Sequence, residues 1–120
     1  MDKEVLVYQR AVLAGLLIES YVLDENNERL RIIEEIISSK SYLFLPVHIS
    51  ILKKALEEIK LTRAEGCYEC WVISEAFFET LNDSEKAEFN EILSTGALIV
   101  KMIPAYLNLI HQKTLLRKVI

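Results

Sequence analysis

The chain has 120 residues, with 18 acidic and 14 basic side chains that give a net charge of −4. The apolar fraction of 52% and the charged fraction of 27% are typical of a compact protein, and the length predicts one domain, residues 1–120. The acidic balance, without a basic stripe carrying interleaved aromatic residues, disfavours nucleic acid as a partner.

No segment resembles a membrane helix, which needs roughly 20 apolar residues. The longest charge-free run, residues 41–52, is much shorter and contains a proline. The first residues, "MDKEVLVYQR", carry acids and no signal-peptide pattern. We therefore expect a cytoplasmic protein without a membrane partner. The abundance of Ile, Glu and Lys is a compositional hint of a thermophile.

Charge is distributed unevenly along the chain. Residues 65–91 carry eight acids against one base, Lys86, whereas residues 101–120 carry four bases and no acid. Opposite signs predict attraction between these segments within one chain or across a dimer. The alternative is that they form solvated helix faces of unequal sign.

Three short apolar runs have the composition of buried strands. The first is residues 4–8, "EVLVY", which can equally be the start of one long helix from about Asp2. The second, residues 41–46, and the third, residues 97–104, both end at a proline, which cannot donate to a β-ladder. We interpret all three as strands.

Helices are predicted between these runs. Residues 9–23 are apolar on nearly all sides and indicate a central buried helix, and residues 28–40 are amphipathic. Residues 47–62 show the clearest apolar spacing, with two pairs four residues apart on the outer face, Lys53–Glu57 and Lys54–Glu58. Residues 67–81 and 105–120 complete the set, together with a short helix from Asn82 to about Leu93. That helix has a capping-box pattern, with Glu85 three residues after Asn82.

Strands separated by helices predict an α/β fold with a small parallel sheet of about three strands, covered by helices on both faces. The alternative is an all-α helical bundle, in which the apolar runs are parts of helices. The conformation of residues 4–8 and 97–103 distinguishes the two folds, because the all-α fold requires both segments to be helical.

The element order resembles that of the PIN domain, a family of metal-dependent ribonucleases. The similarity lies in "VLVYQRAVLAGLLIES", in "NERLRIIEEIISSKSYLFLP" and in the amphipathic helix after Pro46. The resemblance implies a parallel sheet, helices on both sides, and carboxylates that hold divalent metal.

The carboxylates that the family uses are missing at the matching positions. The first predicted strand runs into Tyr8-Gln9-Arg10, and the place of the helix glutamate, near Leu52–Lys53, is basic. Because Mg²⁺ needs at least one or two carboxylates besides its waters, we expect a degenerate, catalytically inactive version. The alternative is a divergent nuclease that binds Mg²⁺ or Mn²⁺ through Asp24, Glu34 and Glu57.

The sequence Cys67-Tyr-Glu-Cys70 is a Cys-x-x-Cys motif, the one known functional motif in the chain. We expect two structural thiols that pack in the fold. The alternatives are a disulfide, a shared metal site and a redox site. Redox catalysis is disfavoured because Glu65 and Glu69 oppose formation of a thiolate.

Two histidines lie in otherwise apolar stretches. His48 follows Pro46, and we expect it to cap the helix or to bond to the backbone at its start. We interpret His111 as an interface histidine whose ring nitrogens have hydrogen-bond partners. Tyr42, Phe44, Trp71, Phe77 and Phe78 are predicted to belong to the core.

These patterns favour a non-catalytic domain that acts through protein–protein contact, as a homodimer or as an accessory subunit of a larger assembly. We expect no catalytic residue and no cofactor. The preferred interface is the last predicted helix, which is apolar with a basic end. Its candidate residues are Tyr106, Leu107, Ile110, His111, Leu115 and Arg117.

Overall fold

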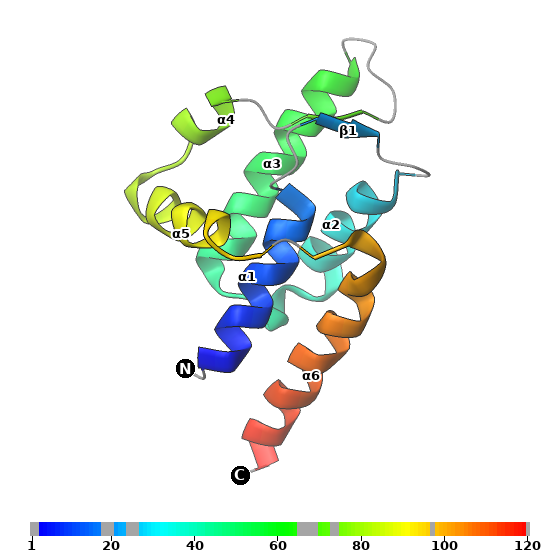
Figure 1. The fold of residues 1–120 in the computed structure, drawn as a ribbon, viewed down its shortest axis with the longest axis vertical. Coiled ribbons are helices and arrows are strands. Elements are labelled where there is room, and N and C mark those ends of the chain that lie inside the picture. The colour runs from blue at the N-terminus through cyan, green and yellow to red at the C-terminus, as the bar shows by residue number, and fades with distance from the viewer. Residues whose placement is uncertain are drawn as a thin grey trace.

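The computed structural model describes residues 3–17, 21–23, 27–64, 70–72, 75–96 and 98–119. These residues form six α-helices, two short 3₁₀ helices and two three-residue strands (Figure 1). The α-helices are α1 (Lys3–Leu17), α2 (Glu28–Ser39), α3 (Pro46–Ala64), α4 (Glu75–Glu79), α5 (Asp83–Leu93) and α6 (Ile103–Val119). The 3₁₀ helices are η2 (Ser41–Leu43) and η3 (Val100–Met102), and the strands are β1 (Tyr21–Leu23) and β2 (Cys70–Val72).

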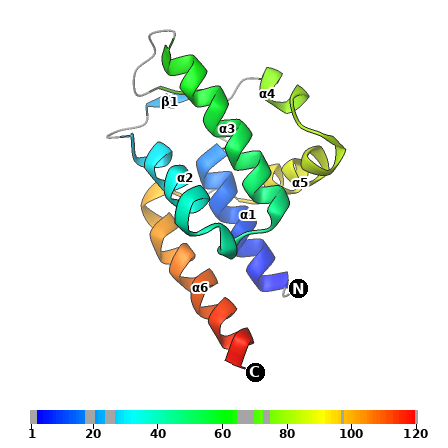
Figure 2. The same ribbon diagram turned by 180° about the vertical axis from the view of Figure 1, so that it is seen from behind.

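Helix α1 is the centre of the molecule. It lies between α5 on one side and α6 on the other, while α2 and α3 cover it from behind (Figures 1 and 2). All of residues 11–17 are buried, so α1 contributes a continuous apolar block to the core. The largest fully buried side chains around it are Leu13, Leu16, Leu17, Ile33, Ile36, Ile51, Leu52, Ile59, Phe77, Ile92 and Ile103.

The described strands pair with each other and form no parallel sheet. β1 and β2 are antiparallel, with Tyr21 opposite Val72 and Leu23 opposite Cys70. The predicted α/β fold with a PIN-like parallel sheet is therefore wrong. The alternative, an all-α helical arrangement, is confirmed in class, with this small ribbon as an addition at one edge.

Residues 4–8 are helical because the apolar pattern continues through them without a break. Val5, Gln9, Val12 and Leu16 are buried and follow each other at three- or four-residue intervals, which is the spacing of one helix face. A short β-branched run is ambiguous by itself, and here it extends into the helix that follows. The long-helix alternative for this segment is the observed one.

The prolines explain why the other two predicted strands are absent. Residues 41–46 form η2 and the start of α3, with Pro46 as the first residue of that helix. Residues 100–104 form η3 and the start of α6, with Pro104 in its first turn. Proline is favoured in the first turn of a helix, where its missing N–H has no intrahelical acceptor. Each proline lies in the first turn of a helix here.

The remaining predictions of helices and of core residues are confirmed only in part. The helix predicted at 47–62 and the capping box at Asn82 are confirmed. The helix predicted at 67–81 is wrong in its first part, because residues 70–72 are β2, and only α4 remains. Phe44 and Phe77 are buried as predicted, but Tyr42 is 55% exposed and does not belong to the core.

The link from α5 to α6 crosses the front of α1 (Figure 1). A Cβ atom built on Gly15 would lie 2.6 Å from the carbonyl oxygen of Leu98. Because any larger side chain would meet backbone there, glycine permits the link to pack directly on α1. No helix of the described residues is long and apolar enough to cross a membrane.

Candidate functional site

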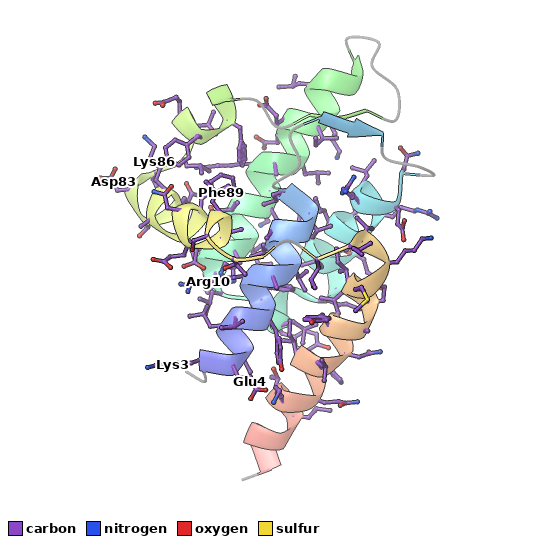
Figure 3. All side chains as sticks on the ribbon, in the orientation of Figure 1. Lys3, Glu4, Arg10, Asp83, Lys86 and Phe89 are labelled. Carbon is purple, nitrogen blue, oxygen red and sulfur yellow. The ribbon has the colours of Figure 1, made fainter. Side chains whose placement is uncertain are left out.

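Polar side chains of α1, α3 and α5 meet inside the molecule around Glu88. The Nε and Nη2 atoms of Arg10 donate to Oε2 and Oε1 of Glu88 at 2.9 and 2.8 Å, so the pair is bidentate. Figure 3 shows Arg10 on the side of α1 that faces α5. His48 Nε2 lies 2.7 Å from Oε2 of the same carboxylate. One glutamate therefore connects three helices.

The second nitrogen of His48 fixes the tautomer of its ring. The backbone N–H of Leu45 donates to Nδ1 at 3.3 Å, so Nδ1 is an acceptor. The proton is therefore on Nε2, which donates it to Glu88. His48 is fully buried, and this burial lowers its pKa and favours the neutral ring.

His48 also caps α3. Leu45 precedes Pro46, so His48 is the third residue of the helix, and it accepts the free N–H at the helix start, as a glutamate does in a capping box. The prediction that His48 bonds to the backbone at a helix start is confirmed.

A second buried carboxylate lies one turn earlier on α5. Glu85 is 1% exposed, and its Oε1 accepts from Lys54 Nζ at 2.6 Å and from the N–H of Asn82 at 2.8 Å. Its Oε2 accepts from the hydroxyl of Ser50. Burial raises the pKa of Glu85, but the hydrogen bonds from Lys54, Ser50 and Asn82 outweigh it and lower the pKa to about 2.

This buried polar cluster, Arg10, His48, Ser50, Lys54, Glu85 and Glu88, consists of two bonded sets, one around Glu88 and one around Glu85. The Arg10 and His48 hydrogen bonds lower the pKa of Glu88 even though its burial acts in the opposite direction. Both carboxylates are therefore ionised at neutral pH and have donors on both oxygens. The two carboxylates therefore serve as structural links between helices.

The residues proposed as nuclease ligands are not brought into this cluster. Glu34 on α2 and Glu57 on α3 have exposed side chains, and Asp24 lies outside the described residues. Over the described part of the chain, no three His, Cys, Asp or Glu side chains are grouped so that they could hold a metal ion.

The cysteine pair lies largely beyond what the structure describes. Cys67 is outside the described residues, and of Cys70 only the backbone is described, opposite Leu23 in the ribbon. The expectation that Cys70 lies on a helix is wrong, because the residue belongs to β2.

The candidate interface residues of α6 lie on different sides of the helix. Leu107 and Ile110 are buried in the core of the same chain. Tyr106 packs edge-on against Tyr8 of α1, with ring centroids 5.5 Å apart, and His111 contacts Tyr42 through Nδ1 at 3.0 Å. Leu115 is 47% exposed, and the side chain of Arg117 is outside the described residues.

One edge of α6, beside its contact with α1, exposes other apolar residues. Met102, the last residue of η3 just before α6, is 46% exposed, and Leu109 is 38% exposed. Met102, Tyr106, Leu109 and Lys113 follow each other at intervals of four, three and four, so they lie along one stripe of the helix. We call Met102, Tyr106 and Leu109 the outer stripe of α6, in which Tyr106 is the half-buried member that packs against Tyr8.

Charged residues of the acidic segment, residues 65–91, and of the basic segment, residues 101–120, pair with other helices of the same chain. The acids Glu85 and Glu88 are paired with α1 and α3, and Lys113 of the basic segment pairs with Glu4 of α1 at 3.0 Å. Sequence reasoning found Glu85 through its capping box. It missed Arg10 and Glu88, for which the only signal was an arginine within an otherwise apolar helix.

We compared the chain with protein-family models, with curated proteins and with solved structures, and nothing matches it. The resemblance to the PIN domain therefore has no support from any family or relative, and the helical fold contradicts it.

Proposed function

We propose that this chain is a non-catalytic protein–protein interaction domain that associates with a second copy of itself through the outer stripe of α6. The observation that carries the proposal is the exposure of Met102 and Leu109 on a helix at the edge of the molecule. Exposed apolar residues that follow one helix face are typical of an interaction site, whereas single scattered ones are common on any surface.

The position of α6 supports this assignment. One side of the helix packs against α1, and its last turns extend beyond the first turn of α1 in both views (Figures 1 and 2). Ile99, just before η3, is 72% exposed and adds to the apolar surface at the start of the stripe. The exposed apolar residues therefore lie along an edge of α6 beside its buried side, where a partner can cover them.

A second copy is the simplest partner for such a stripe. In a two-fold dimer the same patch contacts itself, so one exposed stripe suffices for both partners. The charged residues next to the stripe suit such an arrangement, because Lys113 of α6 and Glu4 of α1 place both signs beside it. An antiparallel pair of α6 helices would bring each sign close to its opposite on the other copy.

The polar groups at the centre of the molecule support a structural role there. His48 and Glu85 are almost completely buried, and each of their polar atoms is bonded to another group of the chain. A catalytic residue has to reach a substrate, and these side chains already hold α3 and α5 together.

The test is sedimentation equilibrium of the wild-type chain and of Leu109→Glu over a concentration series. We expect the wild-type to dimerise and Leu109→Glu to remain monomeric with an unchanged circular dichroism spectrum. The matched control is Leu61→Glu, because Leu61 is 67% exposed on α3 and lies away from α6. It should dimerise as the wild-type does.

Two results would overturn the proposal. The first is a wild-type chain that is monomeric at every concentration, which would exclude self-association. The second is a dimer that survives both Leu109→Glu and Met102→Glu, which would place the interface elsewhere.

A further inference from the structure

We propose that α4 and α5 form a flap, residues 75–93, which is latched to α1 and α3 by charge and which opens as a unit in acid while the other helices stay folded. The proposal concerns a conformational device of the fold and does not depend on self-association. It rests on three observations: the flap has its own internal contacts, its attachment includes a network of ion pairs, and each titrating group in the latch responds to acid in the same direction.

The flap keeps a set of contacts within itself. Phe89 packs against Phe77 and Phe78, with ring centroids 5.8 and 6.1 Å apart. Lys86 Nζ lies 5.4 Å from the ring centroid of Phe78 and 4.0 Å from Glu79. Figure 3 shows Lys86 and Phe89 on α5. These contacts join α4 to α5 and would persist if the pair moved together.

The attachment of the flap to the rest of the molecule depends on the buried polar cluster. Glu88 binds Arg10 of α1 and His48 of α3, and Glu85 binds Lys54 and Ser50 of α3. Lys54 also donates to the carbonyl oxygen of Thr80, at the end of α4, at 3.1 Å. The flap also contributes four buried apolar side chains to the common core, Phe77, Leu81, Phe89 and Ile92, so charge is one part of its attachment and apolar burial is the other.

Acid weakens each link of this latch. The pKa of Glu85 and that of Glu88 are lowered in the folded chain from the ordinary value of 4.5, so their stabilisation is complete above that pH and is lost as pH falls below it. The pKa of His48 is lowered from 6.5 by burial, so the folded state favours its neutral form and loses stability as pH falls below 6.5. The three effects add.

The charged groups that face the latch reinforce this direction. Arg10 and Lys54 are the basic partners of the two carboxylates, so protonated carboxylates would leave both of them beside uncharged groups. Glu91 of α5 also lies near Arg10, at 3.8 Å, but its side chain is 61% exposed and gives a weak link. On the flap itself, Glu79 and Lys86 face each other and take no part in the latch.

The helices behind the flap depend on apolar contacts that do not titrate. Residues 11–17 of α1 are buried in the common core, with Leu13 and Leu16 fully enclosed, and α1 packs on α6 as well as on α5. Because burial of apolar surface does not change with pH, this part of the core should remain protected when the flap opens.

The experiment is native-state amide hydrogen exchange of the full chain between pH 7 and pH 3, corrected for the intrinsic exchange rates. We expect the protection factors of α5 amides to fall by at least about tenfold over this range, while those of residues 11–17 stay within about twofold. Glu88→Gln should produce the same selective loss already at pH 7. The matched control, Glu91→Gln, should leave α5 protected.

Two outcomes would overturn the proposal. One is joint loss of protection in α5 and in residues 11–17 at every pH, which would mean that the chain opens only by global unfolding. The other is Glu88→Gln with wild-type protection of α5. If Glu88→Gln does not fold, the pH series on the wild-type chain still decides between selective and joint opening.

Discussion

Helices α1 and α5 are neighbours that are held in place by different forces. Residues 11–17 of α1 are all buried and none is charged, whereas the buried residues of α5 are Glu85, Phe89 and Ile92. Apolar burial has no directional requirement and no dependence on pH, but a buried carboxylate requires specific donors and an ionised state. The comparison indicates that the two helices should respond differently to mutation and to acid.

The largest expected effect is on the apolar side of this comparison. Leu13→Ala removes a fully buried side chain from α1 and should lower the free energy of unfolding by about 2–5 kcal/mol, because it leaves a cavity. The loss should be the same at pH 7 and at pH 5, which urea titration at both values would measure. Leu61→Ala, at an exposed position, should change stability by less than about 0.5 kcal/mol. A Leu13→Ala loss that varies with pH would contradict the assignment of α1 as the apolar partner.

Glu85→Gln tests the polar side at constant size. The amide accepts fewer hydrogen bonds than the carboxylate and leaves Lys54 beside an uncharged group, so we expect a loss of about 1.5–3 kcal/mol at pH 7. Because the pKa of Glu85 is lowered from 4.5 to about 2, the difference from the wild-type should be largest above 4.5 and should shrink as pH falls toward 2. Urea titrations at pH 7 and pH 3.5 would show this. Glu79→Gln, at a side chain that is 77% exposed, should have almost no effect at either pH.

His48→Gln separates the hydrogen bonds of His48 from its titration. A glutamine at the third helical residue can accept the N–H of Leu45 and donate to Glu88, so stability at pH 8 should stay within about 1 kcal/mol of the wild-type. Because the pKa of His48 is lowered from 6.5, the wild-type loses stability as pH falls below that value, and the variant should lose less between pH 7 and pH 5. Equal losses in both proteins would show that His48 does not carry this pH dependence.

The same contrast explains how much the sequence could predict. Local patterns identified the helix at 47–62, the buried centre of α1 and the capping box at Asn82, since each depends on residues within one or two turns. They failed where a short apolar run is compatible with strand and helix, as in residues 4–8. The two prolines were interpreted as strand ends, although proline is equally suited to the first turn of a helix.

The buried polar cluster was beyond local patterns for a different reason. Arg10 and Glu88 are 78 positions apart, and Lys54 and Glu85 are 31 apart, so these pairs exist only after the helices have packed. Lys54 was predicted to pair with Glu58 on its own helix, and it reaches Glu85 on α5. A single sequence gives the charge of each residue but not the partner that burial selects for it.

The smallest expected effect concerns a polar contact at the surface. Tyr42→Phe removes the hydroxyl that lies 3.0 Å from His111 Nδ1 and keeps the ring, whose centroid is 5.9 Å from that of His111. Tyr42 is 55% exposed, so water can replace the lost partner, and the expected loss is about 0.5 kcal/mol. Urea titration at pH 7 against Glu85→Gln would measure the difference. If Tyr42→Phe were as costly as Glu85→Gln, burial would not be what makes the bonds of α5 strong, and the contrast between the two helices would have to rest on charge alone.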